Sequence, residues 1–156
     1  MRARLAFGLS MAIEFDAYFR CYVLGRKRVR IMQYDPKQPH HLRYVADFKT
    51  PPDLLKRMER DAIALCEGLG YDMNTVEFAI RGGIPYAIDF MNPAPDAELA
   101  SVGEYNHKWI VDNMTDFILK KLKSGWETPE YRWTAMLNPA EKAAKKAMPK
   151  AKAKKA

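Results

Sequence analysis

Apolar and polar residues alternate along three segments near the start of the chain, at residues 11–15, 18–24 and 28–34. Alternation with a period of two is typical of strands that bury one face. Gly25 and the basic residues after it indicate a turn between the second and third segments. We therefore expect an antiparallel meander of three strands.

A helical period follows the proline-bearing loop that ends at Pro52. Asp53 can cap a helix that ends at Gly68 and Gly70. A second helix is expected from Ser101, with Glu104 completing a capping box, to about Leu122. Spacings of three and four residues predict these buried positions: Leu54, Leu55, Met58, Ala62, Leu65, Cys66 and Leu69 in the first helix, and Trp109, Met114, Phe117 and Ile118 in the second.

Between the two helices, residues 75–80 and 86–91 alternate again around a turn that contains two glycines. Two strands joined in this way predict an antiparallel hairpin. The expected fold class is α+β, an antiparallel sheet with two main helices packed on one face.

The hairpin has to bury its alternating apolar residues on a single face, and this fixes its register. With a three-residue loop, the pairs are Val76 with Phe90, Phe78 with Ile88, and Ile80 with Tyr86. Glu77 then lies opposite Asp89 on the polar face, with Cβ atoms about 5 Å apart. Facing carboxylates repel unless a shared proton or a cation compensates, and their hard oxygens suit Mg²⁺. The alternative is that both acids are solvent-facing residues, each near a Lys or Arg.

The chain has 156 residues, 48% of them hydrophobic, which is typical of one domain with its own core. Its net charge is +7, but residues 140–156 contain seven lysines and one glutamate and carry six of those charges. The nearly neutral remainder does not favour a nucleic-acid-binding face. We expect the Lys/Ala-rich tail to be disordered. The alternative function is a non-catalytic α+β binding module whose tail contacts nucleic acid or another polyanion.

Neither the cysteines nor the histidine pair has the spacing of a metal site. Cys21 and Cys66 have apolar neighbours and no second cysteine nearby, which favours a reducing, cytoplasmic location. His40 and His41 are adjacent, so their side chains point apart, and we interpret them as surface loop residues. No apolar run has the length of a membrane-spanning helix.

Residues 74–96, NTVEFAIRGGIPYAIDFMNPAPD, resemble the metal-binding hairpin of ATP-grasp enzymes. In that family an acid on one strand is followed about a dozen residues later by a second acid and an asparagine. The resemblance implies that Glu77, Asp89 and Asn92 bind Mg²⁺ and, through it, ATP. The family usually places the asparagine two residues after the second acid. Here the interval is three, so Asn92 needs a bulge or turn to face the same ion.

Residues 11–36, MAIEFDAYFRCYVLGRKRVRIMQYDP, resemble the adenine-side hinge and following strands of the family, most closely in the glutamate-ligase and glutathione-synthetase-like branch. The resemblance implies that Glu14 and Phe15 lie near the adenine. It also implies that Arg20 is a catalytic and cofactor-binding residue that contacts phosphate or an acylphosphate. The alternative role for Arg20 is an exposed strand arginine. Arg43 is a second, weaker candidate cation.

The resemblance covers residues 11–122 and implies the C-terminal lobe of an ATP-grasp core. The expected organisation is an unassigned segment at 1–10, the lobe-like domain at 11–138 and the tail at 139–156. The family's earlier lobe, with its lysines and glycine-rich loop, does not precede Met11. We expect a partial domain that contributes Mg-ATP binding to an ATP-dependent carboxylate-amine ligase. Such a domain would be inactive alone, with ATP and a carboxylate as its ligands once a missing lobe complements it.

Overall fold

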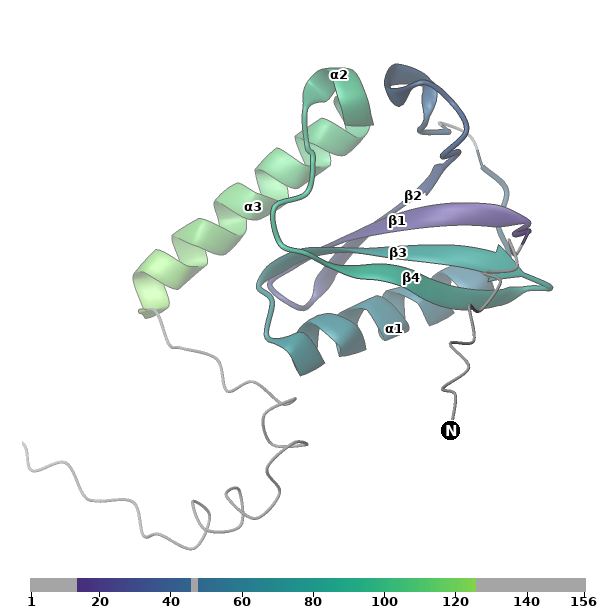
Figure 1. Ribbon diagram of the computed structural model, residues 1–156. Helices are drawn as coiled ribbons and strands as arrows, with labels where there is room; N and C mark the ends of the chain where they lie inside the picture. Colours follow the sequence, from purple (N-terminus) through teal and green to yellow (C-terminus); the bar gives the residue numbers. More distant parts are fainter. Residues whose placement is uncertain (1–13, 46–47, 126–156) are drawn as a thin grey trace, which may run out of the picture.

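Two antiparallel hairpins combine into one four-stranded sheet in the computed structural model, which describes residues 14–45 and 48–125 (Figure 1). The strands lie in the order β2-β1-β3-β4. Their bounds are β1 Ala17–Leu24, β2 Arg28–Tyr34, β3 Met73–Arg81 and β4 Ile84–Asn92. The helices are the 3-10 turn η1 at His40–Leu42, α1 at Pro52–Leu69, α2 at Leu99–Val102 and α3 at Glu104–Ser124. The expected α+β class with an antiparallel sheet is confirmed.

Strand β1 is an inner strand that pairs with both β2 and β3. Side chains alternate along a strand, so β1 contributes to both faces of the sheet. Phe19, Cys21 and Val23 join the core beneath α1, whereas Tyr22 joins a second cluster beside α2 and α3. Arg20 lies on the same face as Tyr22, which places it away from α1.

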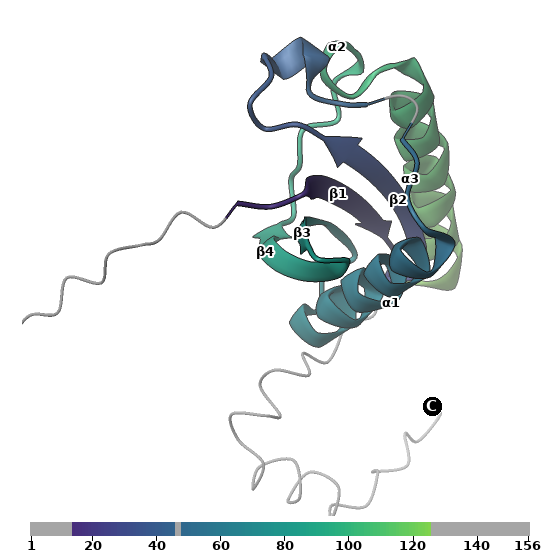
Figure 2. The same cartoon turned by 90° about the vertical axis from the view of Figure 1, so that its right-hand side faces the viewer.

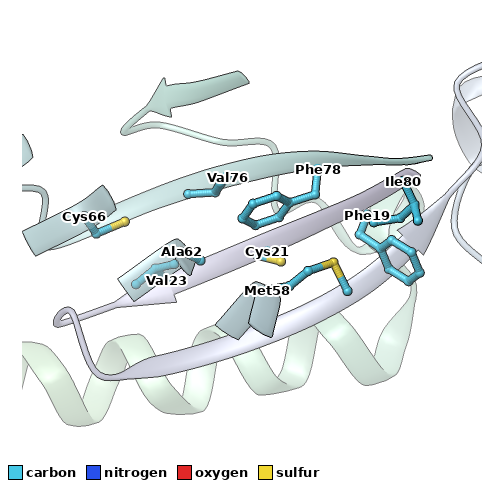
Figure 3. Packing of buried hydrophobic residues seen from close by; sticks show 9 residues of the cluster. All are labelled: Phe19, Cys21, Val23, Met58, Ala62, Cys66, Val76, Phe78 and Ile80. Carbon is cyan, nitrogen blue, oxygen red and sulfur yellow. The ribbon is translucent and has the colours of Figure 1, made fainter. Parts of the chain in front are cut away.

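Helix α1 covers the first face of the sheet. It begins after Pro51 and ends at Gly70, whose left-handed backbone (φ 81°) lets its N–H bond to the Cys66 carbonyl at 2.8 Å. Met58, Ala62 and Cys66 are completely buried against the strands. Figure 3 shows these side chains meeting those of β1 and β3: Phe19, Cys21, Val23, Val76, Phe78 and Ile80. The helix predicted from Asp53 is therefore present.

Helix α3 lies beside β1 and β2 (Figure 2), and Val102 of α2 and Ile110 of α3 pack with Tyr22 and Met32. Helix α1 covers the face of the sheet that carries Phe19. The second cluster, beside α3, contains Tyr22, which alternates with the core residues of β1. Only Ile110 of α3 is buried, and the Ile118 side chain, expected in the core, is 45% exposed.

Two of the expected element boundaries were wrong. Glu14 and Phe15 do not form a strand, and residues 11–13 lie outside the described part of the chain. β3 occupies the edge of β1 that such a strand would need. The second helix does not run unbroken from Ser101. It is interrupted at Gly103, whose φ of 78° ends α2, and α3 begins without a side-chain cap.

The expected end of α3 near Leu122 is close to the observed one, because Gly125 follows Ser124 with a φ of 80°. The tail predicted at 139–156 and the end of the predicted 11–138 domain lie outside the described residues. Within residues 14–45 and 48–125, no helix combines the length and apolar character needed to cross a membrane.

Candidate functional site

Glu77 on β3 and Asp89 on β4 are directly paired in the sheet register. Their expected opposition is present, but the expected hairpin loop was wrong. Gly82 and Gly83 form a two-residue turn, so Phe78 pairs with Ala87 and not with Ile88. An irregularity between Phe78 and Glu77 then shifts the register and brings Asp89 opposite Glu77.

The same register change explains why two β4 side chains expected in the core are exposed. Tyr86 pairs with Ala79 and Ile80 pairs with Pro85. The Tyr86 and Ile88 side chains are therefore 46% and 47% exposed, and Pro85 takes the buried position. Phe90, beyond the irregularity, does pack against the core beneath α1 as predicted.

A second irregularity lies between the pairs Glu77–Asp89 and Thr75–Asn92, so β4 contains one extra residue there. This is the bulge that the unusual spacing of Asp89 and Asn92 requires. It sets Asn92 opposite Thr75, on the face that carries Glu77 and Asp89.

Asn74 bridges this bulge with both ends of its amide. Its Nδ2 donates to the Phe90 carbonyl at 2.8 Å, and its Oδ1 accepts from the Asn92 N–H at 2.8 Å. The Asn74 side chain is fully buried, so these bonds replace ladder bonds that the bulge removes. Asn74 therefore positions Asn92 from the opposite face of the sheet.

Arg20 lies opposite Glu77 across β1 and β3 and binds its carboxylate. Arg20 Nε and Nη2 donate to Glu77 Oε1 at 2.8 and 2.5 Å, and Arg20 Nη1 donates to the Tyr44 hydroxyl at 2.6 Å. The Tyr34 hydroxyl donates to Glu77 Oε2 at 2.6 Å. The guanidinium also lies over the Tyr34 and Tyr44 rings, 5.3 and 5.9 Å from their centroids. Arg20 is therefore a partnered residue with a fixed side chain and not a free surface arginine.

The surroundings keep the arginine charged and the phenols neutral. Partial burial disfavours charge on Arg20, but Tyr44 and the Glu77 carboxylate outweigh it and raise the pKa of Arg20. Burial raises the pKa of Tyr34, and the hydrogen bond to Glu77 raises it further. Burial also raises the pKa of Tyr44, although Arg20 opposes this effect. The two phenols can thus donate hydrogen bonds throughout the neutral range.

Aromatic rings extend from this network toward the start of the described chain. The Phe15 ring lies 5.8 Å from Tyr18 edge-on and 6.3 Å from Tyr86, and Tyr18 lies 5.9 Å from Tyr34. Phe15 is therefore close to the site, whereas Glu14 is exposed just before β1. The predicted adenine-binding role of these two residues stays a prediction.

Asp89 differs from Glu77 in its surroundings. It is exposed, and its Oδ1 accepts a 3.4 Å hydrogen bond from the Met91 N–H within the bulge. The weaker candidate Arg43 does not join the site, because its Nε donates to the Gln38 carbonyl at 3.0 Å within its own loop. His40 and His41 are exposed as predicted, and His40 lies 3.3 Å from Asp96.

A cavity of about 500 Å³ adjoins the network through Tyr44. Arg30, His41 and Ser101 also line it, together with the first residues of α3. The buried Ser101 hydroxyl lies beside the Asp96 carboxylate, whose pKa it helps to lower, whereas the first N–H groups of a helix have no internal acceptor. The cavity thus offers backbone donors at the start of α3, on the side of the network where Tyr44 lies.

Tyr34, Tyr44 and Asn74 are the site residues that the sequence did not reveal. Tyr34 follows Met32 by two residues on β2, so the pattern places both on one face of the sheet, but it does not show that Tyr34 contacts Glu77. Tyr44 reaches the site through one isolated bridge between Tyr34 and Tyr44, which no local pattern predicts.

Comparison with known proteins gives a likeness in structure alone. No family model matches the sequence, and no curated protein does so. The crystal structure of D-alanine–D-alanine ligase from Bacillus anthracis complexed with ATP superposes with a TM-score of 0.51 at 15% identity. The match covers 72% of this chain and 41% of the ligase chain. The chain shares the fold of part of this ATP-grasp ligase.

The ATP-grasp fold agrees with the arrangement expected from the two sequence segments, and the chain spans less than half of the ligase it matches. Within the described residues no group of three or more His, Cys, Asp or Glu side chains could hold a metal ion. An ion on this face would therefore be bound by the two carboxylates with amide, water or ligand oxygens.

Proposed function

We propose that the chain contributes Mg-ATP binding to an ATP-dependent carboxylate-amine ligase. The observation that carries the proposal is the pairing of Glu77 with Asp89, with Asn92 brought to the same face by a bulge. The ATP-grasp fold supports it, because the matched ligase was crystallised with ATP.

The donor set fits Mg²⁺, which prefers oxygen ligands and usually keeps several waters. An ionised carboxylate has about four lone-pair positions. On Glu77, Arg20 occupies Oε1 with two hydrogen bonds and Tyr34 occupies one position of Oε2. Glu77 would therefore bind through the remaining position of Oε2, and exposed Asp89 would supply a second oxygen, assisted by the Asn92 amide. The ion would neutralise phosphate charge.

Arg20 is placed to contact an anion while it remains bound to Glu77. A guanidinium has five N–H donors, and three of those on Arg20 are used. The other two are free to bind a phosphate or acylphosphate oxygen. Glu77 and the two tyrosines would hold the guanidinium in place for that contact, which reduces the entropy lost on binding.

The cavity beside Tyr44 is a candidate site for the carboxylate substrate. Arg30 and the start of α3 supply donors, and the positive end of the helix dipole favours an anion. Glu104 also lines this cavity, so a ligand that carries an amine beside its carboxylate fits the local charges better than a simple carboxylate.

Catalysis would need a second lobe, from a longer chain or from another protein. Positioning and the exclusion of water account for most of phosphoryl-transfer catalysis, and Asp89 is exposed in the described part of the chain. We therefore expect nucleotide binding by this chain and no turnover without the second lobe.

Isothermal titration of Mg-ATP into the full chain tests the proposal. Asp89→Asn removes a metal ligand at an exposed position and should weaken binding at least about tenfold. Asp112→Asn makes the same charge change on the exposed side of α3 and should leave binding unchanged. Equal affinities for the wild type and Asp89→Asn would overturn the proposed metal site.

A further inference from the structure

A second cavity, of about 680 Å³, lies at the other end of β1 from the aromatic residues near Phe15. It is bordered by the β1–β2 turn, Asp72 before β3, and the C-terminal parts of α1 and α3. In Figure 1 this turn lies between the ends of those two helices. None of the residues lining it belongs to the Arg20–Glu77 network or to the cavity beside Tyr44. We call it the distal cavity.

Positive charge predominates in the lining of the distal cavity. Two carboxylates, Glu67 and Asp72, line it, and five cationic side chains surround them: Arg26, Lys27, Arg28, Lys120 and Lys121. Like charges that converge on one cavity repel, just as facing carboxylates do. An anion of more than one charge would relieve this repulsion.

Shared carboxylates fix the positions of the cations. Asp72 Oδ1 accepts from Arg26 Nε and Nη2 at 3.1 and 2.7 Å, while Asp72 Oδ2 lies 3.6 Å from Lys121 Nζ. Asp116 likewise lies between Arg28 and Lys120, at 3.1 and 3.8 Å. Each acid therefore holds two cations around the cavity without neutralising both.

The backbone of Arg26, in the turn between β1 and β2, is strained. A glycine at this position would not be strained. Arg26 has a φ of 57°, and among the described residues it is the one non-glycine with a positive φ. A left-handed backbone costs a residue with a Cβ about 1 kcal/mol. Gly25 before it packs so closely on Phe117 that an added Cβ would come within 2.9 Å of the ring. Arg26 therefore has an unfavourable backbone conformation, and its side chain is held by Asp72.

We propose that the distal cavity binds a small phosphate-type polyanion, independently of the Mg-ATP site. Arg26 and Arg28 present planar guanidinium groups suited to phosphate oxygens, and the lysines add point charges. Leu24 and Phe117 also line the cavity, and its volume of about 680 Å³ is large enough for a di- or triphosphate.

Inorganic triphosphate without Mg²⁺ is the probe, titrated calorimetrically into the full chain. Arg26→Gly removes the charge and relieves the strained backbone, and Lys121→Gln removes a second cation. Each should weaken binding about tenfold. Thermal melting checks that both variants are folded. The lysines at 142–155 are unchanged in every variant, so their contribution to binding cancels.

Two control variants distinguish the distal cavity from general surface charge and from the proposed Mg-ATP site. Arg60→Gln removes one charge from the exposed side of α1, and Asp89→Asn alters the proposed Mg-ATP site. Both should bind triphosphate within about twofold of the wild type. Wild-type affinity in Arg26→Gly would overturn the proposal, as would an equal loss in Arg60→Gln. Loss of Mg-ATP binding in Asp89→Asn, with unchanged triphosphate binding, would support a distal site that is independent of the Mg-ATP site.

Discussion

The Tyr34 hydroxyl donates a 2.6 Å hydrogen bond to Oε2 of Glu77, the carboxylate oxygen that Arg20 does not bind. Glu77 is thus held by neighbours on two strands, β1 and β2. Its side chain is 14% exposed, so these partners replace most of the water that would otherwise surround it. Glu77 therefore has a structural role in addition to the proposed metal-binding role.

Changing Glu77 to Gln should lower the free energy of unfolding by about 2 kcal/mol, because Arg20 loses a charged partner in a partly buried site. Urea unfolding measures the change. Asp89→Asn is the matched control, because Asp89 is exposed and should change stability by less than about 0.5 kcal/mol. Similar losses of stability in the two variants would contradict a structural role for Glu77 that Asp89 lacks.

Stability should fall at high pH because of the buried phenols. The pKa of Tyr34 is raised by burial and by Glu77, so the folded state keeps this proton at a pH where the unfolded chain loses it. The contribution is complete below the unfolded value near 10 and is lost as the pH rises above it. Unfolding at pH 8.5 and 11 should show the fall.

Tyr34→Phe should make that fall shallower, since one of the phenols with a raised pKa is removed. Tyr22 and Tyr44, whose pKa values burial also raises, would account for the remainder. Tyr105→Phe, at a 72% exposed position, provides the comparison. An unaltered pH dependence in Tyr34→Phe would mean that this phenol ionises as easily in the folded chain as in the unfolded one.

Substitution by alanine should destabilise the protein to different extents at two glycines that have nearly equal φ angles. Gly25 and Gly82 have φ values of 59° and 56°, but an added Cβ meets Phe117 at the first and nothing within 4 Å at the second. Gly82→Ala should cost about 1 kcal/mol from the backbone alone. Gly25→Ala should cost about 1–3 kcal/mol more from overpacking. Thermal unfolding of both variants measures the difference, and equal costs would exclude the contact with Phe117.

Asn74→Ala should cost about 2–3 kcal/mol, because it leaves the Phe90 carbonyl and the Asn92 N–H without partners. It should also weaken Mg-ATP binding, because Asn92 is then no longer positioned. Thr75→Val at the next position is the control. The Thr75 hydroxyl is buried without a partner, so its loss should be neutral or stabilising. Urea unfolding and calorimetry on both variants test the two effects separately.

Local pattern predicted those parts of the fold that depend on neighbours in sequence. The strands around Arg20 and Glu77 and the helix after Pro52 follow from periodicity. The need for a bulge follows from the resemblance to ATP-grasp enzymes, which implies that Asn92 faces the same ion as Asp89 although it stands three residues later. The predicted pairing of Glu77 with Asp89 was correct because two departures from the expected register cancel there. The turn is one residue shorter than expected, and an irregularity beside Phe78 restores the pairing.

The remaining features depend on contacts between distant segments. Tyr44 reaches Arg20 through a loop whose course no repeat specifies, and Asn74 acts on Asn92 across a bulge that alternation does not reveal. The break at Gly103 could have been suspected, because a glycine inside a helical pattern often marks an end. The helical period of the flanking residues concealed it.

The odd-numbered residues of strand β1 face the core beneath α1, and its even-numbered residues include Arg20 and, in the second cluster, Tyr22. An inserted or deleted residue within β1 would exchange these two sets, so that Arg20 would face α1 and Cys21 would face Tyr34 and Glu77. We expect this strand to vary among related proteins by substitution, while differences in length accumulate in the loop between β2 and α1, where no such exchange occurs.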